Sequence, residues 1–414
     1  MNSIKNNKAI YLLLILLAFG CKSNSQQKVD KPINENEITW HPGIMDALAQ
    51  AKKENKLLFV ECYSPTCPYC QALEPFFKTP EVAIKYNSNF ISYKMDVTKE
   101  GERKFLDDRS VWLPSFPMFL FFDGDGKLVH QAGADPTVES INGNADLALD
   151  PDKRASSYAS RFAKGERNID FLSNYAAYGR VTLDTMATLN AANELFKIYP
   201  KDKLGTEESW KILKKSVNDI DNGFSKYWFD HVKEAAAFEA KEGHPGNENN
   251  IFGGIIQSSI YSSRGKAYDV AKLQTVKEYM KKAGAGEYAE SVTWELEVKA
   301  NIRENQPAKA LAIGEKTVSK FKGNGSAIVY ITRVFIDSFK DNSYIPSAKK
   351  WLAEAATSIN QDNVKAEYFY ELARVHQKAG DTAEAKTNAQ SALTLANKIG
   401  SKNTKFQELL NSLN

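Results

Sequence analysis

The sequence contains little cysteine and little histidine. Of its 414 residues only four are cysteine and five are histidine. All four cysteines (Cys21, Cys62, Cys67 and Cys70) lie within the first 70 residues, so the remainder of the chain folds without thiol chemistry. A scaffold held together by disulfides needs more cysteines, distributed along the chain, and is excluded. The cysteines therefore indicate a function rather than a framework.

An excess of charge of one sign is also missing. The 54 basic and 51 acidic residues give a net charge of +3, which does not indicate a nucleic-acid partner. After the N-terminal segment no apolar run approaches the roughly 20 residues that span a bilayer. Residues 140–414 contain no Ser/His/Asp triad, phosphate loop or paired-carboxylate motif. The length predicts two or three domains.

The first 20 residues have the pattern of an export signal. Lys5 and Lys8 precede a short apolar segment, 10–19, which ends in Leu-Leu-Ala-Phe-Gly-Cys at 16–21. This ending resembles the bacterial lipobox, in which the cysteine is lipidated and becomes the first mature residue. The alternative is an ordinary cleaved signal peptide with an incidental cysteine. Both readings place the mature chain outside the cytoplasm, in the periplasm or cell envelope, and the first anchors it to a membrane through lipidated Cys21.

The central motif is Cys67-Pro68-Tyr69-Cys70. An apolar, β-prone run at 57–60 leads into it through a polar turn, and a helical pattern follows it. A helix N-terminus carries partial positive charge and unpaired N–H groups, which favour a thiolate. We therefore expect Cys67 to attack a disulfide and Cys70, one turn later, to resolve the mixed disulfide.

The elements around this motif alternate between strand and helix. Strands are predicted at 38–40, 57–62, 90–97, 118–122 and 127–131, and helices at 45–55, 69–77 and 102–108. Asp123-Gly124-Asp125-Gly126 predicts a hairpin turn. A calcium loop is disfavoured, because Ala134 occupies the position where a bidentate Glu is needed.

Segment 38–135 resembles the thioredoxin family. Glu61, six residues before Cys67, matches the family's buried carboxylate, and Lys94 matches the lysine beside it. The resemblance implies that Glu61 handles the proton of the second cysteine. Burial raises a carboxylate's pKa, which suits that role near neutral pH.

The resemblance extends to the substrate groove. Phe116-Pro117 matches the family's cis-proline, which faces the thiols, and Pro75 matches the proline that kinks the active-site helix. With Pro68 and Tyr69 of the motif, Phe116 and Pro117 are the implied substrate-binding residues. The implied redox group is the Cys67–Cys70 disulfide itself, with no further cofactor.

The sequence also departs from the family. Thr66 replaces the Trp before the first cysteine, and Pro68-Tyr69 replaces Gly-Pro, as in glutaredoxins. We expect a moderately reducing couple, and reductase, oxidase and isomerase directions stay open.

Metal binding and a structural role are the alternatives to redox chemistry for the cysteines. Zinc needs a second pair or a His partner, and the plant-type iron–sulfur spacing of Cys62, Cys67 and Cys70 lacks a fourth ligand unless Cys21 serves, so no metal is predicted. Cys62 should be a core thiol on the strand face opposite Glu61, with a regulatory third-thiol role as the alternative.

From about residue 158 strands disappear and amphipathic helices follow one another. They are predicted at 154–164, 168–178, 183–198, 207–221, 224–242, 250–264, 268–282, 287–303, 307–321, 326–340, 345–359, 363–379, 382–398 and 403–412. Ala310, Ala348 and Ala385 each begin a similar pattern, at a spacing of 38 and 37 residues. Such a period is typical of tetratricopeptide-like solenoids, and an irregular helical bundle is equally open.

The predicted fold is an α/β thioredoxin-like domain followed by an all-α helical-repeat or bundle domain. The expected boundaries are a signal peptide at 1–20, a flexible tether at 21–36, the thioredoxin-like domain at 37–136, a helical connector at 137–180 and the helical domain at 181–414. The predicted function is a membrane-tethered thiol-disulfide oxidoreductase acting on protein disulfides, with an upstream electron donor or acceptor as partner. The alternative is a scaffold whose helical repeat binds a protein partner and whose thioredoxin-like unit only docks.

Overall fold

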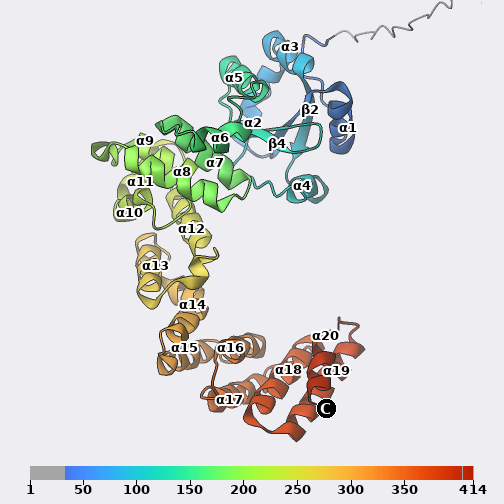
Figure 1. Cartoon of the computed structure of the whole chain (residues 1–414), viewed down its shortest axis with the longest axis vertical. Coiled ribbons are helices and arrows are strands. Elements are labelled where there is room, and N and C mark those ends of the chain that lie inside the picture. The colour runs from blue at the N-terminus through green and yellow to red at the C-terminus, as the bar shows by residue number, and fades with distance from the viewer. Residues whose placement is uncertain (1–32, 403, 414) are drawn as a thin grey trace, which may run out of the picture.

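The structure, a computed structural model, describes residues 33–402 and 404–413. The predicted signal peptide and Cys21 lie outside the described residues. Figure 1 shows a sheet-containing domain at the N-terminal end, from which helices run away and then curve back to form an open arch. The prediction of an α/β domain followed by an all-α domain is confirmed.

The N-terminal domain is built on a four-stranded sheet. Its strands are β1 (Leu57–Tyr63), β2 (Phe90–Asp96), β3 (Met118–Phe122) and β4 (Leu128–Ala132), in the order β2-β1-β3-β4. β1 is parallel to β2 and antiparallel to β3, and β3 and β4 form the predicted hairpin. The strand predicted at 38–40 is only a single bridge between Trp40 and Ser92. The Ile38 amide donates to the Phe77 carbonyl and the Thr39 amide to the Asn87 side chain, so neither pairs with β2.

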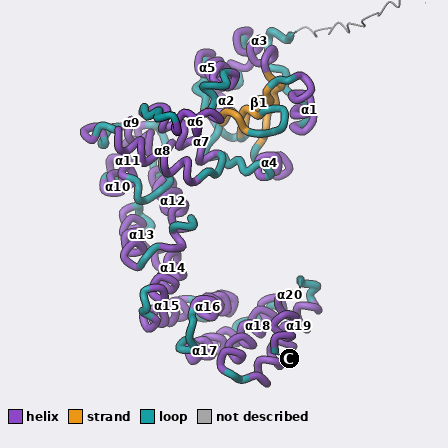
Figure 2. Tube along the Cα trace, in the orientation of Figure 1, coloured by secondary structure: helices purple, strands orange, loops and turns teal. Residues whose placement is uncertain are grey.

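Helices cover both faces of the sheet. Helices α1 (Ile44–Glu54) and α4 (Glu100–Asp107) pack on the face that carries Cys62, while α2 (Pro68–Leu73), α3 (Pro80–Asn89) and α5 (Val138–Leu149) pack on the other. Figure 2 shows this wrapping of strands by helices. The apolar side of α5 belongs to the same core, so the core continues beyond residue 136.

The helix predicted at 69–77 is interrupted. α2 ends at Leu73, and after Pro75 the chain makes a short 3₁₀ turn at Phe76–Lys78. Proline has no N–H to donate and disfavours helix at the residue before it, which explains the break. α3, which the sequence patterns did not indicate, then starts at Pro80 with a proline in its first turn.

The all-α region follows the predicted helices closely. Its helices are α6 (Tyr158–Ala163), α7 (Ile169–Val181), α8 (Thr185–Ile198), α9 (Glu207–Ser216), α10 (Gly223–Asp230), α11 (Val232–Lys241), α12 (Asn247–Ile260), α13 (Val270–Lys282), α14 (Ala289–Arg303), α15 (Pro307–Lys320), α16 (Gly325–Ser338), α17 (Ile345–Ala356), α18 (Asp362–Ala379), α19 (Thr382–Lys398) and α20 (Thr404–Ser412). One expected helix, 224–242, is two helices that meet at His231. The His231 ring nitrogen Nδ1 lies 2.7 Å from the Tyr227 carbonyl oxygen, and this local bond competes with the helical hydrogen bond to the same oxygen.

Among the described residues no helix combines the length and apolar character needed to cross a bilayer.

The three alanines of the predicted repeat occupy the same position in alternate helices. Ala310, Ala348 and Ala385 are each the fourth residue of their helix, α15, α17 and α19, and each is fully buried. Consecutive helices pack as neighbours along the arch (Figure 1). The small side chain at this position allows close approach of the next helix.

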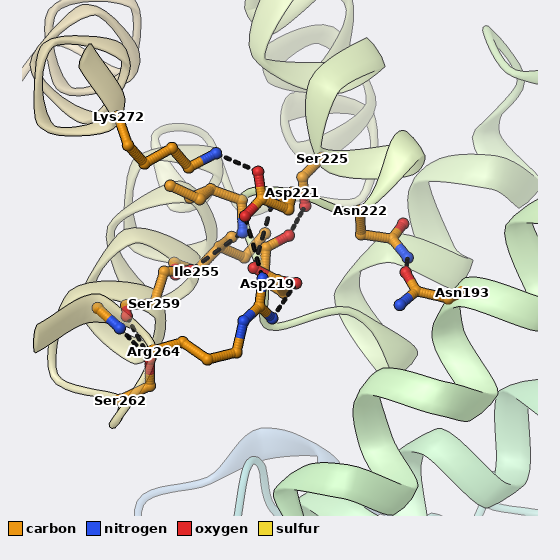
Figure 3. Close-up of polar contacts among 12 residues, drawn as sticks. Asn193, Asp219, Asp221, Asn222, Ser225, Ile255, Ser259, Ser262, Arg264 and Lys272 are labelled. Carbon is orange, nitrogen blue, oxygen red and sulfur yellow. Dashed lines mark hydrogen bonds and ion pairs between the residues drawn. The ribbon is translucent and has the colours of Figure 1, made fainter. Parts of the chain in front are cut away.

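Polar contacts fix the first half of the arch. Figure 3 shows the turn between α9 and α10, where Asp219 and Asp221 accept bonds of 2.9 and 3.1 Å from Arg264. Lys272 of α13 also pairs with Asp221. Because cations already pair with both carboxylates, this acidic turn is a joint between helices.

The two domains share packed contacts. Val181, at the end of α7, is buried in the core of the N-terminal domain. The Trp112 amide donates to the Val181 carbonyl at 2.8 Å, and the Tyr178 hydroxyl donates to the Leu128 carbonyl at 3.0 Å. The helical domain is therefore fixed against the sheet domain.

Candidate active site

The Cys67-Pro68-Tyr69-Cys70 motif opens helix α2, as the sequence predicts. Cys67 is the N-cap, and its sulfur accepts the Cys70 amide hydrogen at 3.3 Å. Pro68 occupies the first helical turn, where its missing N–H costs no bond. Cys67 is partly exposed, whereas Cys70 is only 1% exposed. Cys67 is thus the sulfur that an incoming disulfide can reach.

Burial gives Cys70 different chemistry. It raises the pKa of the Cys70 thiol to about 12, and the hydrogen bond with Cys67 acts in the same direction. The charge of Glu61 also raises it. Cys70 therefore keeps its proton until a base takes it.

Glu61 can be that base. It lies in β1, paired with Lys94 of β2 and Phe119 of β3, and is fully buried. Neither carboxylate oxygen has a hydrogen-bond partner among the described residues. Burial raises the pKa of Glu61 to about 7, and Lys94, with Nζ 3.8 Å from Oε2, partly opposes this. A group with this pKa accepts and returns a proton near neutral pH.

Lys94 links Glu61 to the end of the active-site helix. Its ammonium also pairs with Glu74, the residue that follows α2, and lies 4.7 Å from the centre of the Tyr63 ring. Sequence reasoning missed Glu74. Its position four residues after Cys70 on a helical pattern was a usable indication.

The implied substrate-binding residues surround Cys67. The Phe116–Pro117 peptide bond is cis, and the Cys67 sulfur lies 3.9 Å from the Phe116 carbonyl oxygen. Phe116 is 38% exposed and Tyr69 is 54% exposed. These large apolar side chains leave a surface next to the thiol on which a polypeptide can lie.

Two exposed aromatic residues were not predicted. Trp112, 42% exposed, lies in the same loop as Phe116, and its backbone is bonded to α7. His244, between α11 and α12, lies with its ring centre 6.0 Å from that of Tyr69. A contact between segments so distant in sequence follows from the tertiary fold, and no sequence pattern marks it.

Cys62 is fully buried on the opposite face of β1, among Val60, Met95 and Leu120. Burial raises the pKa of its thiol far above the ordinary value. This matches the prediction of a core thiol.

A sheet with this order, a cysteine pair at a helix N-terminus, a buried acid behind it and a cis-proline beside it define a thioredoxin-like domain. The family described as thioredoxin-like matches residues 39–124. The match covers the site from Glu61 to Pro117 and leaves the helical domain unassigned.

Curated relatives match a short part of the chain. The chain is 36% identical over 62 residues to spermatogenesis-associated protein 20 of Rattus norvegicus and to that of Mus musculus, which is 15% of this chain and 8% of each relative. The chain thus aligns with less than a tenth of those proteins. A solution structure of a protein described as a disulphide-isomerase candidate from Bacteroides thetaiotaomicron is 28% identical, with 28% of this chain and 97% of that chain covered and a TM-score of 0.25.

Proposed function

We propose that the protein is a thiol-disulfide oxidoreductase that acts on protein disulfides through Cys67 and Cys70. The observation that carries the proposal is the helix-capped, reachable sulfur of Cys67 in front of a buried Cys70 and a buried Glu61. The thioredoxin-like domain supports thiol–disulfide chemistry in general.

In the first step the Cys67 thiolate attacks one sulfur of a substrate disulfide. The new bond joins Cys67 to that sulfur, the substrate S–S bond breaks, and the other substrate sulfur leaves as a thiolate that takes up a proton. The amide of Cys70 and the N-terminal end of α2 stabilise the negative charge on Cys67 before the attack.

In the second step Cys70 attacks Cys67. Glu61 accepts the Cys70 proton, the mixed disulfide breaks, and the second substrate sulfur leaves as a thiolate. The substrate gains two electrons and the Cys67–Cys70 disulfide forms. A dithiol donor returns the enzyme to its reduced form, and the same steps in reverse oxidise a substrate.

The residues beside Cys67 hold the substrate chain. Pro117 has no N–H, so the backbone around Phe116 stays available to an extended segment. Pro68, Tyr69 and Phe116 supply apolar contact.

The location we propose is extracytoplasmic, with the chain tethered to a membrane by lipidated Cys21. The export pattern of residues 1–20 and the lipobox-like ending support it. An oxidising compartment suits a protein that exchanges disulfides.

The test uses single cysteine variants of the full chain. We expect Cys70→Ser to accumulate disulfide-linked adducts at Cys67 in its own compartment, detected by nonreducing electrophoresis and mass spectrometry. Cys67→Ser should abolish disulfide reduction in a turnover assay, whereas Cys62→Ala, the matched control, keeps it. If no adduct accumulates and Cys67→Ser matches the wild type, the proposal is wrong.

A further inference from the structure

The loop between α11 and α12 reaches the redox site from the helical domain. Residues 242–247, here called the His244 loop, place the His244 ring against Tyr69, between the two cysteines of the motif. α11 and α12 are labelled in Figure 1. A part of the helical domain thus borders the surface on which a substrate chain would lie.

Hydrogen bonds hold the backbone of this loop in one conformation. The His244 amide donates to the Glu239 carbonyl at 2.8 Å, and the Asn247 amide donates to the His244 carbonyl at 3.1 Å. Gly243 and Gly246 both have positive φ, 84° and 88°, a conformation that glycine adopts without strain. The turn that presents His244 is therefore a defined structure.

The buried carboxylate of Glu239, near the end of α11, holds the loop in place. Glu239 Oε1 accepts from Trp210 Nε1 and from Lys214 Nζ, both at 2.6 Å, and Oε2 accepts from Asn247 Nδ2 at 2.7 Å. Burial by itself raises the pKa of Glu239, but the bonds from Lys214, Asn247 and Trp210 together lower it below its usual range. A fully buried, ionised and hydrogen-bonded group is costly unless all its bonds are kept, so it favours one arrangement of the loop.

The same residues could be mistaken for a metal site. Ligand atoms of Glu239, Glu242 and His244 lie within 4.8 Å of one another. The Lys214 ammonium, however, donates to Glu239 at 2.6 Å and to Glu242 at 2.8 Å, so a cation already bridges the two carboxylates. We therefore interpret the cluster as a set of ion pairs and hydrogen bonds that holds the loop in place, and not as a metal site.

The position of the loop relative to Cys67 is also fixed. The buried Val181 and the bond from Trp112 attach α7 to the sheet domain, and the helices that follow carry the His244 loop. Contacts at two separate places, α7 and Tyr69, oppose rotation of one domain against the other. The His244 loop therefore keeps its position next to Cys67 when a substrate approaches.

We propose that the His244 loop is a wall of the substrate groove, which admits disulfides in flexible, extended polypeptide and excludes those on the surface of folded domains. Attack on a disulfide requires close approach of the sulfur to Cys67. Tyr69 and Phe116 stay exposed beside Cys67, so a narrow segment can reach the sulfur. The bulk of a globular domain would collide with the loop, and such a collision is an effective source of specificity. This inference rests on the proposed oxidoreductase function and names its substrate class.

The test compares two substrates with the same reacting bond. One is ubiquitin with a single introduced surface cysteine in mixed disulfide with glutathione, and the other is an unstructured peptide with the same mixed disulfide. We measure kcat/KM for both with the full chain and with His244→Ala and Glu239→Gln. His376→Ala, on distant α18, is the matched control.

We expect the wild type to prefer the peptide and His244→Ala to reduce that preference by about tenfold, as relief of a steric exclusion should. Glu239→Gln, which loosens the loop, should act in the same direction, and His376→Ala should not change the preference. If the wild type reduces the peptide and neither loop variant changes the preference, the inference is wrong and the proposed function stands. If the wild type reduces neither substrate, the proposed function itself is contradicted.

Discussion

At the scale of single residues, two neighbours on β1 show how burial decides chemistry. Glu61 and Cys62 are both fully buried, on opposite faces of the strand. For Glu61 burial brings the pKa to about 7, where the group can exchange a proton under ordinary conditions. For Cys62 burial moves the pKa away from that range, so its thiol stays protonated and unreactive.

This difference gives a pH-dependent prediction for Glu61. Only the ionised carboxylate can accept the Cys70 proton, so the rate of the resolving step should fall as the pH falls through about 7. Glu61→Gln should slow this step by about 10²-fold, the usual contribution of a general base, and should remove the dependence near pH 7. Single-turnover decay of a Cys67-linked mixed disulfide, followed from pH 5.5 to 8.5, measures both effects.

Glu74→Gln serves as the control, because Glu74 also pairs with Lys94 but is partly exposed. It should keep a pH dependence near 7. An unchanged pH profile in Glu61→Gln would show that another group takes the proton.

At the scale of elements, the helix pairs depend on small residues at their contacts. A Cβ on Gly314 of α15 would lie 2.5 Å from Phe335 and 2.6 Å from Trp351, closer than packed atoms allow. A Cβ on Gly253 of α12 would meet no atom within 4 Å. The two glycines are both inside helices and differ only in their surroundings.

We therefore expect opposite effects of the same substitution. Gly314→Ala should lower the free energy of unfolding by about 1–3 kcal/mol through overpacking. Gly253→Ala should raise it by about 0.5–1 kcal/mol, because alanine loses less backbone entropy in a helix. Urea unfolding followed by tryptophan fluorescence measures both, and a stabilising Gly314→Ala would contradict the packing of α15 against α16 and α17.

At the scale of the whole molecule, the sheet domain and the helical arch are in contact at separate places. Val181 of the helical domain lies in the sheet domain's core, and His244 lies against Tyr69. In the function proposed above, the arch restricts which chains reach Cys67, and the sheet domain supplies the thiol chemistry.

The proposed tether is also a property of the whole chain. In a bacterial host that processes lipoproteins, the wild type should be found in the membrane fraction, because each buried CH₂ of an acyl chain contributes about 0.8 kcal/mol to membrane binding. Cys21→Ser should move the protein out of the membrane fraction, and Cys62→Ala should not. A wild type that fractionates without the membrane would rule out the lipid anchor.

Local patterns were enough to predict most elements of the sheet domain. The cysteine pair after an apolar strand, the acid six residues earlier and the Phe116-Pro117 step are all matched in the structure. The predictions of a strand at 38–40 and of an unbroken helix at 69–77 were wrong. The first segment pairs with β2 only at Trp40, and Pro75 ends the helical hydrogen bonding in the second. α3 was missed, although Pro80 in its first turn is a usable signal of a helix start.

The sequence by itself determined the candidate reactive groups of this protein: which thiol stands at the start of a helix, which acid lies behind it and where helices replace strands. These depend on neighbours a few residues apart, so spacing reveals them. Only the tertiary structure decided the surroundings of the site. The pairing of Lys94 with both Glu61 and Glu74, the burial that sets the pKa of Glu61, and the contact of His244 with Tyr69 all arise from chain segments brought together by packing. No pattern along the chain encodes such contacts, because they depend on how the domains pack in three dimensions.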